Sequence, residues 1–453
     1  MFSKKTRSTV FCLMILSFFS CKKDDFTPVD IYTLNPDLTA VNSELDAWLK
    51  TTFLDPYNIS VSYRYNQYMH ENDRNVSPVD PQFVKPFMAN IYTGFLLPYE
   101  KVAGSTFIKK YAPKEIVLWG SLNYQSANSA LLGDASAGAR INMYQLNSYT
   151  PSVSFAKDRI GVIHHEFVHI LNQTYPRPLD FETISAGSYN ATYTNVTPDQ
   201  ARNTGFVTPY ASSRAEEDFS EMAKALLVFG PSWFDNWVKT STSGATALRR
   251  KETSLVDYYG TMGVNLRDLQ KAVQIYLSDT LKDVSVSFPY WLNQGTLYTG
   301  LTVNLSNTMY TQYGQSSLFA TQYGRLRDSM AVASRTLTSL QFLFTKKDSL
   351  TLRINSTTAT GTSFVVDNDF SMKINEATGG VQFAKVANKV GTNYTNNSIL
   401  GTKLTNTIIA YLVNNSFVGA WLQANMPGSM YTKTAGFYVA NDPTNYFYGT
   451  LTQ

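Results

Sequence analysis

The chain has little cysteine, little net charge and no long apolar run, and each scarcity excludes a class of protein. Two cysteines in 453 residues cannot hold together a disulfide scaffold, so stability must come from hydrophobic cores, which a chain of this length can build. No segment after the first twenty residues reaches the run of about 18 apolar residues that a membrane-spanning helix needs.

The formal charge is also low. It is +4 for the whole chain, and it falls to +1 without residues 1–20, because these hold three basic residues and no acidic one. A nearly neutral chain lacks the basic surface that nucleic-acid binding requires. No glycine-rich phosphate loop or nucleic-acid module is present either, so we expect no nucleic-acid partner.

Histidine is scarce as well, yet three of the four histidines fall within six positions. The stretch His165-Glu166-Phe167-Val168-His169 is an HExxH sequence. Residues four apart share one face of a helix, so both imidazoles can bind one metal ion, and Glu166 can take a proton from the water that the metal activates. Surrounding apolar residues predict this helix, and Pro176 predicts its end. The alternative is a chance match on a buried helix.

A catalytic zinc needs three protein ligands and one open position, and no third histidine follows at short spacing. The acidic segment 213–221 is the best source of a carboxylate. Ser213 and Glu216 match a capping box, which predicts that a helix begins there. Glu217 and Glu221 then share another face, where Glu217 can bind the metal and Glu221 can accept a hydrogen bond from a ligand imidazole. The alternative is a solvated acidic first turn that complements the helix dipole.

An HExxH followed by a helix with Glu-x-x-x-Glu resembles the gluzincin metallopeptidases. With Tyr210 seven residues before Glu217, the segment is similar to the lethal-factor branch of that group. The Zn²⁺ ligands that this resemblance implies are His165, His169 and Glu217. It also implies that Glu166 is the general base, that Tyr210 stabilises the oxyanion or protonates the leaving amine, and that Glu221 supports a ligand imidazole.

The first residues predict a lipoprotein. Lys4, Lys5 and Arg7 form a basic start, and residues 10–19 are an apolar stretch too short to span a bilayer. Ser20-Cys21 then matches a cleavage and acylation site. The run Lys22–Asp25 resembles the surface-export signal of Bacteroidetes-type lipoproteins. We therefore expect a lipid anchor at Cys21 in the outer membrane, facing the cell exterior; the alternative is an ordinary secretory signal with an unmodified Cys21.

The remaining pattern predicts an α+β fold in two parts. A signal peptide (1–20) and a lipidated tether (21–36) precede a gluzincin-like metallopeptidase domain (37–283). After it, short strand-like runs between Asn, Gly, Asp and Thr turns predict a β-rich, sandwich-like domain (284–453).

One strand in the peptidase domain, expected shortly before the HExxH helix, has a predicted role in substrate binding. In the resembled fold such a strand forms the edge that pairs with an extended substrate. The residues expected at this edge are Asn142, Met143, Tyr144 and Gln145.

Together these features predict a zinc-dependent hydrolase, most simply a peptidase. The whole chain resembles the zinc metallohydrolase lipoproteins encoded beside TonB-dependent nutrient importers. This resemblance implies protein or peptide substrates, glycoproteins among them, with the importer and its binding lipoprotein as partners. One alternative is a substrate-binding lipoprotein with a zinc site, although binding alone would not need Glu166 as a base. Another is a hydrolase of non-peptide amides, which uses the same zinc chemistry.

Overall fold

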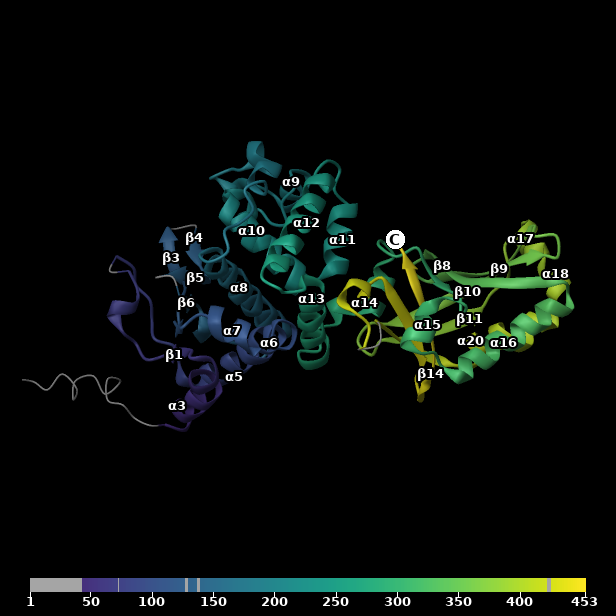
Figure 1. Ribbon diagram of the computed structural model, residues 1–453, viewed down its shortest axis with the longest axis horizontal. Helices are drawn as coiled ribbons and strands as arrows, with labels where there is room; N and C mark the ends of the chain where they lie inside the picture. Colours follow the sequence, from purple (N-terminus) through teal and green to yellow (C-terminus); the bar gives the residue numbers. More distant parts are fainter. Residues whose placement is uncertain (1–42, 72, 127–128, 137–138, 422–424) are drawn as a thin grey trace, which may run out of the picture. The chain divides into compact units, whose positions relative to one another are not determined.

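The computed structural model describes residues 43–453 except 72, 127–128, 137–138 and 422–424 (Figure 1). The expected signal peptide, tether and acylation site at Cys21 lie outside these residues. The chain divides between Ala47 and Trp48, and Trp48–Gln453 form the larger unit. In the described ranges, none of the helices combines the length and the apolar character that a membrane crossing requires.

The first part of the larger unit combines helices with a small mixed sheet. The sheet has the order β1-β2-β6-β5, with bounds β1 (Ser60–Ser62), β2 (Glu115–Leu118), β5 (Gly133–Ser136) and β6 (Arg140–Met143). Strands β1 and β6 run parallel to β2, whereas β5 runs antiparallel to β6. A separate hairpin, β3 (Asn123–Ser126) with β4 (Ser129–Leu131), comes between β2 and β5.

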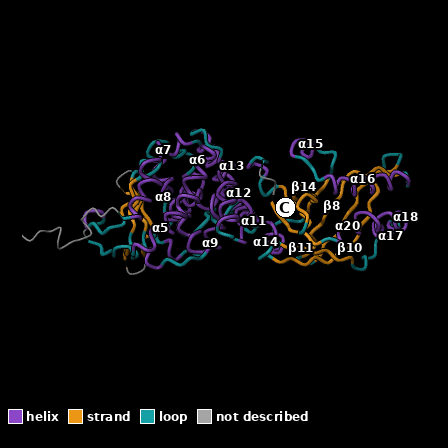
Figure 2. The backbone as a smooth tube through the Cα atoms, turned by 90° about the horizontal axis from the view of Figure 1, so that it is seen from below, coloured by secondary structure: helices purple, strands orange, loops and turns teal. Residues whose placement is uncertain are grey.

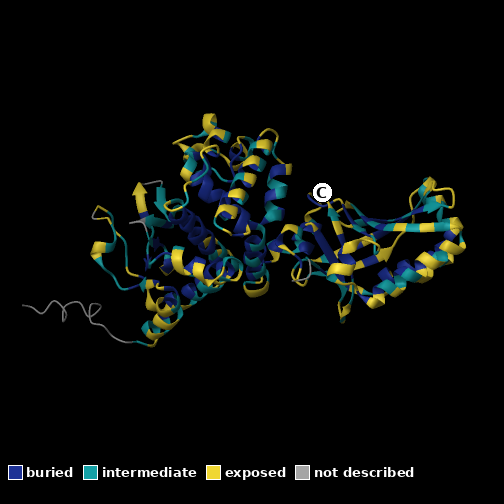
Figure 3. Ribbon diagram, viewed as in Figure 1, coloured by how far each residue is buried: buried dark blue, intermediate teal, exposed yellow. Residues whose placement is uncertain are grey.

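The α-helices of this part hold more of its residues than its strands do (Figure 2). Their bounds are α3 (Glu44–Leu49), α4 (Asp55–Tyr57), α5 (Pro81–Ile91), α6 (Leu97–Ala103), α7 (Ser105–Tyr111), α8 (Val153–Asn172), α9 (Pro198–Asn203), α10 (Ala215–Lys224), α11 (Pro231–Lys239), α12 (Ala245–Thr261), α13 (Leu266–Ile275) and α14 (Phe288–Gln294). Helix α8 packs against β5 and β6 on one side and against α10 on another, so it is buried along most of its length (Figure 3).

The expected edge position of residues Asn142 to Gln145 is wrong. Strand β6 contains Asn142 and Met143 and pairs with β2 on one side and β5 on the other. Within the described residues, the two edge strands of this sheet are β1 and β5, and β5 is the one that pairs with β6. Strand β5 could not be predicted from the sequence, because its residues, Gly-Asp-Ala-Ser, have low strand propensity. Gln145 lies beyond the strand, in a left-handed conformation with φ of 64°.

The C-terminal part is a closed barrel of eight antiparallel strands, in the order β10-β11-β12-β13-β14-β7-β8-β9. Their bounds are β7 (Gly300–Val303), β8 (Arg335–Lys346), β9 (Ser349–Thr358), β10 (Ser363–Asn375), β11 (Gly380–Lys385), β12 (Ser416–Trp421), β13 (Thr434–Val439) and β14 (Asp442–Thr452). The accompanying helices are α15 (Thr308–Tyr313), α16 (Ser317–Val332), α17 (Thr392–Thr395), α18 (Asn397–Leu400), α19 (Thr402–Leu404) and α20 (Ala410–Asn414).

These elements confirm the α+β class and the β-rich C-terminal region. The strands do not form two sheets of a sandwich, because β7 pairs with both β14 and β8 and so closes a single sheet. Closure satisfies the backbone groups that an edge strand would expose. The core of this part includes Phe342, Ile354 and Phe437, which are fully buried.

Candidate metal centre

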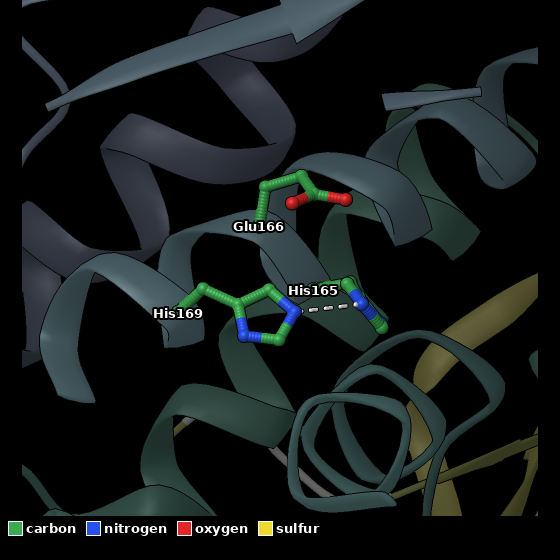
Figure 4. A group of neighbouring side chains, drawn as sticks. All are labelled: His165, Glu166 and His169. Atoms are coloured by element: carbon green, nitrogen blue, oxygen red, sulfur yellow. Dashed lines mark hydrogen bonds between the residues drawn. The ribbon is translucent and has the colours of Figure 1, made fainter. Parts of the chain in front are cut away.

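Helix α8 carries the HExxH residues. The side chain of Ser152 caps its first turn by accepting a hydrogen bond from the backbone N–H of Phe155. The helix ends at Asn172, before Pro176, as the sequence predicts. His165 and Glu166 are buried in it, while His169 is partly exposed. The protein around α8 (Figure 3) therefore shields most of the surface of His165 and Glu166 from solvent, and Figure 4 shows these two side chains together with that of His169.

Helix α10 begins one residue later than the expected capping box would place it. Its N-cap is Arg214 and no side chain caps it, because Ser213 belongs to the preceding 3-10 turn. Glu216 instead pairs with Arg177 across 3.3 Å near the surface. The capping-box prediction is therefore wrong, yet Glu217 and Glu221 are both buried.

Three donor atoms meet between α8 and α10. The Nε2 atoms of His165 and His169 lie 3.1 Å apart, and Oε2 of Glu217 lies 3.0 Å from the first and 3.5 Å from the second. Donors placed tetrahedrally about 2.0–2.1 Å from a zinc ion are separated by about 3.3 Å. The triangle of donors thus has the size that one zinc ion requires.

A second carboxylate lies beside this triangle. Donor atoms of His165, Glu166 and His169 all lie within 4.8 Å of one another. Figure 4 shows the two imidazoles turned toward each other, with Glu166 beside them. Glu217 makes the shorter contacts to both Nε2 atoms, so the geometry favours it as the third ligand and leaves Glu166 free to act on a water molecule.

Outer hydrogen bonds keep both imidazoles facing the triangle. Nδ1 of His165 lies 2.9 Å from Oε1 of Glu221, and Nδ1 of His169 lies 3.4 Å from Oγ of Ser220. Because each Nδ1 has a partner outside the triangle, each Nε2 is free for a metal. Such partners fix the tautomer and the orientation of metal-binding histidines. Ser220 was not predicted, because its contact crosses between two helices distant in sequence.

Both carboxylates of α10 are themselves held in place. Arg214 donates to Oε1 of Glu217 from Nη2 at 2.6 Å and from Nε at 3.2 Å, which leaves Oε2 facing the histidines. Glu221 accepts from Thr208 at 2.8 Å and from Lys224 at 3.0 Å. These donors keep the carboxylates charged and oriented inside the protein.

The electrostatics of the site favour positive charge at the triangle. Burial lowers the pKa of His165, but hydrogen bonds to Glu217 and Glu221 outweigh burial and raise it to about 10. Burial raises the pKa of Glu217, yet His165 and His169 hold it well below its usual range. In the metal-free protein a proton therefore supplies the positive charge that a bound cation would supply.

Tyr210 lies directly at this site. Its ring stacks on His165, with centroids 6.0 Å apart and an angle of 30° between the ring planes. Burial and the nearby carboxylate of Glu217 raise the pKa of Tyr210, so its hydroxyl stays protonated and can donate. Tyr210 lines a cavity of about 630 Å³ together with Glu166, His169 and Glu217.

Residues 38–267 match the model of a family described as "putative zinc-binding metallo-peptidase". The chain belongs to this family. A crystal structure of a "putative zinc-binding metallo-peptidase" from Bacteroides caccae is also similar. The two sequences are 27% identical, and the match covers 52% of this chain and 93% of the Bacteroides caccae chain, with a TM-score of 0.43. No curated protein matches the chain.

The region shared with the zinc-binding metallo-peptidase family contains every donor described above and ends before the barrel. It also contains β5, whose Gly133 and Ala135 line the cavity. The predicted edge residues Asn142 and Tyr144 instead donate to the carboxylate of Asp134 at 2.8 and 2.7 Å. They support the edge strand and do not form it.

A buried ion pair lies at the base of the segment that carries Tyr193, one of the residues lining the cavity. Nζ of Lys251 lies 2.7 Å from Oδ2 of Asp218, and both side chains are almost fully buried. Tyr189 donates to the same oxygen at 2.9 Å, and Lys251 also donates to the carbonyl of Gly205 at 2.7 Å. The segment between them carries Tyr193, which lines the cavity and packs against Tyr210 with ring centroids 5.2 Å apart.

Tyr193 and Lys251 were not predicted. The chain has 29 tyrosines, and nothing in the spacing distinguishes those that reach the site. Lys251 lies in α12, 34 residues after Glu217, so only the folded chain brings it to Asp218.

Proposed function

We propose that this chain is a zinc-dependent peptidase of the gluzincin type, in which His165, His169 and Glu217 bind the metal. The observation that carries the proposal is the triangle of donor atoms, with edges of 3.0, 3.1 and 3.5 Å. Its outer partners leave one nitrogen of each imidazole and one oxygen of Glu217 for the metal. Membership of the zinc-binding metallo-peptidase family supports the same conclusion.

The residues around the triangle have the roles that peptide hydrolysis needs. Zinc, when bound, acts as a Lewis acid that activates water and polarises a carbonyl group. Glu166 takes a proton from the attacking water and delivers it to the leaving amine. Burial raises the pKa of Glu166, which brings its basicity closer to that of a general base working near neutral pH. The hydroxyl of Tyr210 donates to the oxyanion that develops on the scissile carbonyl.

The substrate of this peptidase is an extended segment of protein or peptide. Strand β5 is one of the two edge strands of the described sheet, and its Gly133 and Ala135 line the cavity together with Glu166. A peptide that adds to this edge by backbone hydrogen bonds places a carbonyl group next to the metal centre. Glycoproteins are among the candidate substrates, because nothing in strand addition depends on a substrate's other side chains.

The proposed place of action is the outer membrane, at the cell surface. The basic start, the short apolar stretch and Cys21 support a lipid anchor, and the run Lys22–Asp25 supports export to the surface. A TonB-dependent importer and its binding lipoprotein would then be the partners that take up the cleaved products.

Turnover of a peptide library by the purified protein, with and without a chelator, tests the peptidase function. We expect cleavage that the chelator abolishes and that added zinc restores. Bound but uncleaved peptides would favour a substrate-binding lipoprotein instead. Hydrolysis of glycoconjugate amides, with peptides untouched, would favour a hydrolase of non-peptide amides.

A further inference from the structure

A second, smaller cavity of about 280 Å³ opens beside the metal centre and shares Glu166 and Tyr210 with the first. Leu131 and Val162 give it apolar walls, and Lys224 adds an ammonium group. Its volume suits a single side chain. Because His165 and Glu166 also line it, a side chain that fills it belongs to a residue next to the scissile bond.

Both ends of the Lys224 side chain are fixed. Its stem lies across α8 at Gly161, where an added Cβ would approach Cε of Lys224 to 3.2 Å. Its Nζ donates to Oε1 of Glu221 at 3.0 Å. An ammonium group has three N–H donors, and among the described residues Glu221 is the acceptor found for them. The side chain is 20% exposed, so its remaining donors can meet a ligand in the cavity.

The carboxylate that pairs with Lys224 is already occupied by several donors. Glu221 already accepts from His165, Thr208 and Lys224, so it has little capacity left for a substrate. Burial lowers the pKa of Lys224, but Glu221 and other nearby carboxylates outweigh burial and raise it. The ammonium therefore stays charged, and within the described ranges its hydrogen bond to Glu221 is the one found for it.

We propose that Lys224 determines substrate specificity: the smaller cavity takes a side chain that ends in an acceptor oxygen, such as Glu or Gln, next to the scissile bond. The inference rests on the peptidase function proposed above. An apolar side chain in the same place would offer no acceptor to the donors that Glu221 leaves free, and a site built to donate rejects ligands that cannot accept. The carboxylate and the carboxamide share this chemistry, and the test separates them.

Three peptides that differ only at the residue next to the cleaved bond, carrying Glu, Gln or Met, provide the test. Wild-type protein should cleave the Glu or Gln peptide with kcat/KM on the order of 10- to 100-fold above that of the Met peptide. In Lys224→Met this ratio should fall to about one, and in Lys224→Arg, which keeps charge and donors, it should persist. The ratio compares substrates on the same protein, so a loss of zinc or of stability affects both sides equally.

Binding to the Glu166→Gln variant gives a readout that does not need turnover. The Glu or Gln peptide should bind more tightly than the Met peptide, and adding Lys224→Met should remove the difference. The proposal would be overturned if wild-type protein cleaves and binds the three peptides equally well. It would also be overturned if the ratio of kcat/KM values does not fall in Lys224→Met. If none of the peptides is cleaved, the peptidase function fails, and the binding comparison still decides the role of Lys224.

Discussion

Two buried glutamates at the metal centre differ in role because their surroundings differ. Glu217 receives two hydrogen bonds from Arg214 on one oxygen and faces both imidazoles with the other, so it is suited to bind a cation. Burial raises the pKa of Glu166, which suits it to exchange protons. Pairs of carboxylates whose environments separate their pKa values are a common basis for acid and base chemistry in one site.

The role of Glu166 predicts the effect of Glu166→Gln. The variant keeps the size of the side chain and removes the base, so turnover should fall by about two to four orders of magnitude. Zinc content should stay at the wild-type level, because Glu166 is not among the proposed ligands. Steady-state kinetics together with elemental analysis measure both effects. Undiminished kcat would overturn the mechanism.

Tyr210→Phe tests a separate claim. Removal of the hydroxyl should lower kcat more than it raises KM, because the group acts on charge that develops in the transition state. Fold and zinc content should be preserved, since the ring still stacks on His165. If kcat does not change, Tyr210 has no catalytic role, and the zinc hydrolase interpretation stands without it.

At the scale of elements, the close approach of β5 to α8 places this edge strand beside Glu166, the proposed general base. A Cβ added to Gly133 would lie 2.4 Å from Cγ1 of Val162, a branched side chain with little rotamer freedom. Only a residue without a side chain allows this contact.

Gly133→Ala should therefore push β5 away from α8. We expect a destabilisation of about 1–3 kcal/mol from overpacking, a higher KM and an unchanged zinc content. Thermal unfolding and steady-state kinetics provide the measurement. Gly260→Ala in α12 is the matched control: nothing lies within 4 Å of its added Cβ, so KM should not change and Tm should not fall. A Gly133→Ala protein with wild-type Tm and KM would show that the contact does not position the strand.

Sequence reasoning predicted elements with a strong local signal and missed those that depend on tertiary contacts. The helix around His165 was predicted because its metal-binding pattern and its apolar pattern share one period. The start of α10 was misplaced because Ser213 belongs to the 3-10 turn that precedes the helix. Strand β5 was missed because its small residues carry no strand pattern. Lys224 received no role, since only the packing of α10 on α8 brings it to the cavity.

At the scale of the whole molecule, the metal centre and the barrel are distinct parts of one chain. The family match covers residues 38–267, and the barrel strands begin at Gly300. Alternating strand-like runs predicted the β-rich region, but they could not distinguish a sandwich from a barrel. That difference depends on the pairing of β14 with β7, which lies more than a hundred residues earlier in the chain.

The proposed location of the protein depends on Cys21. Cys21→Ser should yield protein that lacks acyl chains and is released from the membrane fraction. Substitution of the run Lys22–Asp25 should leave the protein lipidated but facing the periplasm. Fractionation and protease treatment of intact cells measure these outcomes. Wild-type protein that resists protease on intact cells would contradict surface display.

The zinc content of three purified proteins tests the central claim most directly: wild type, Glu217→Ala and Glu216→Ala. The two glutamates are neighbours, but Glu217 faces both imidazoles whereas Glu216 is exposed and pairs with Arg177. Elemental analysis should find about one zinc per chain in the wild type and in Glu216→Ala, and much less in Glu217→Ala. Full zinc retention in Glu217→Ala, or its loss in Glu216→Ala, would contradict the ligand set on which the account depends.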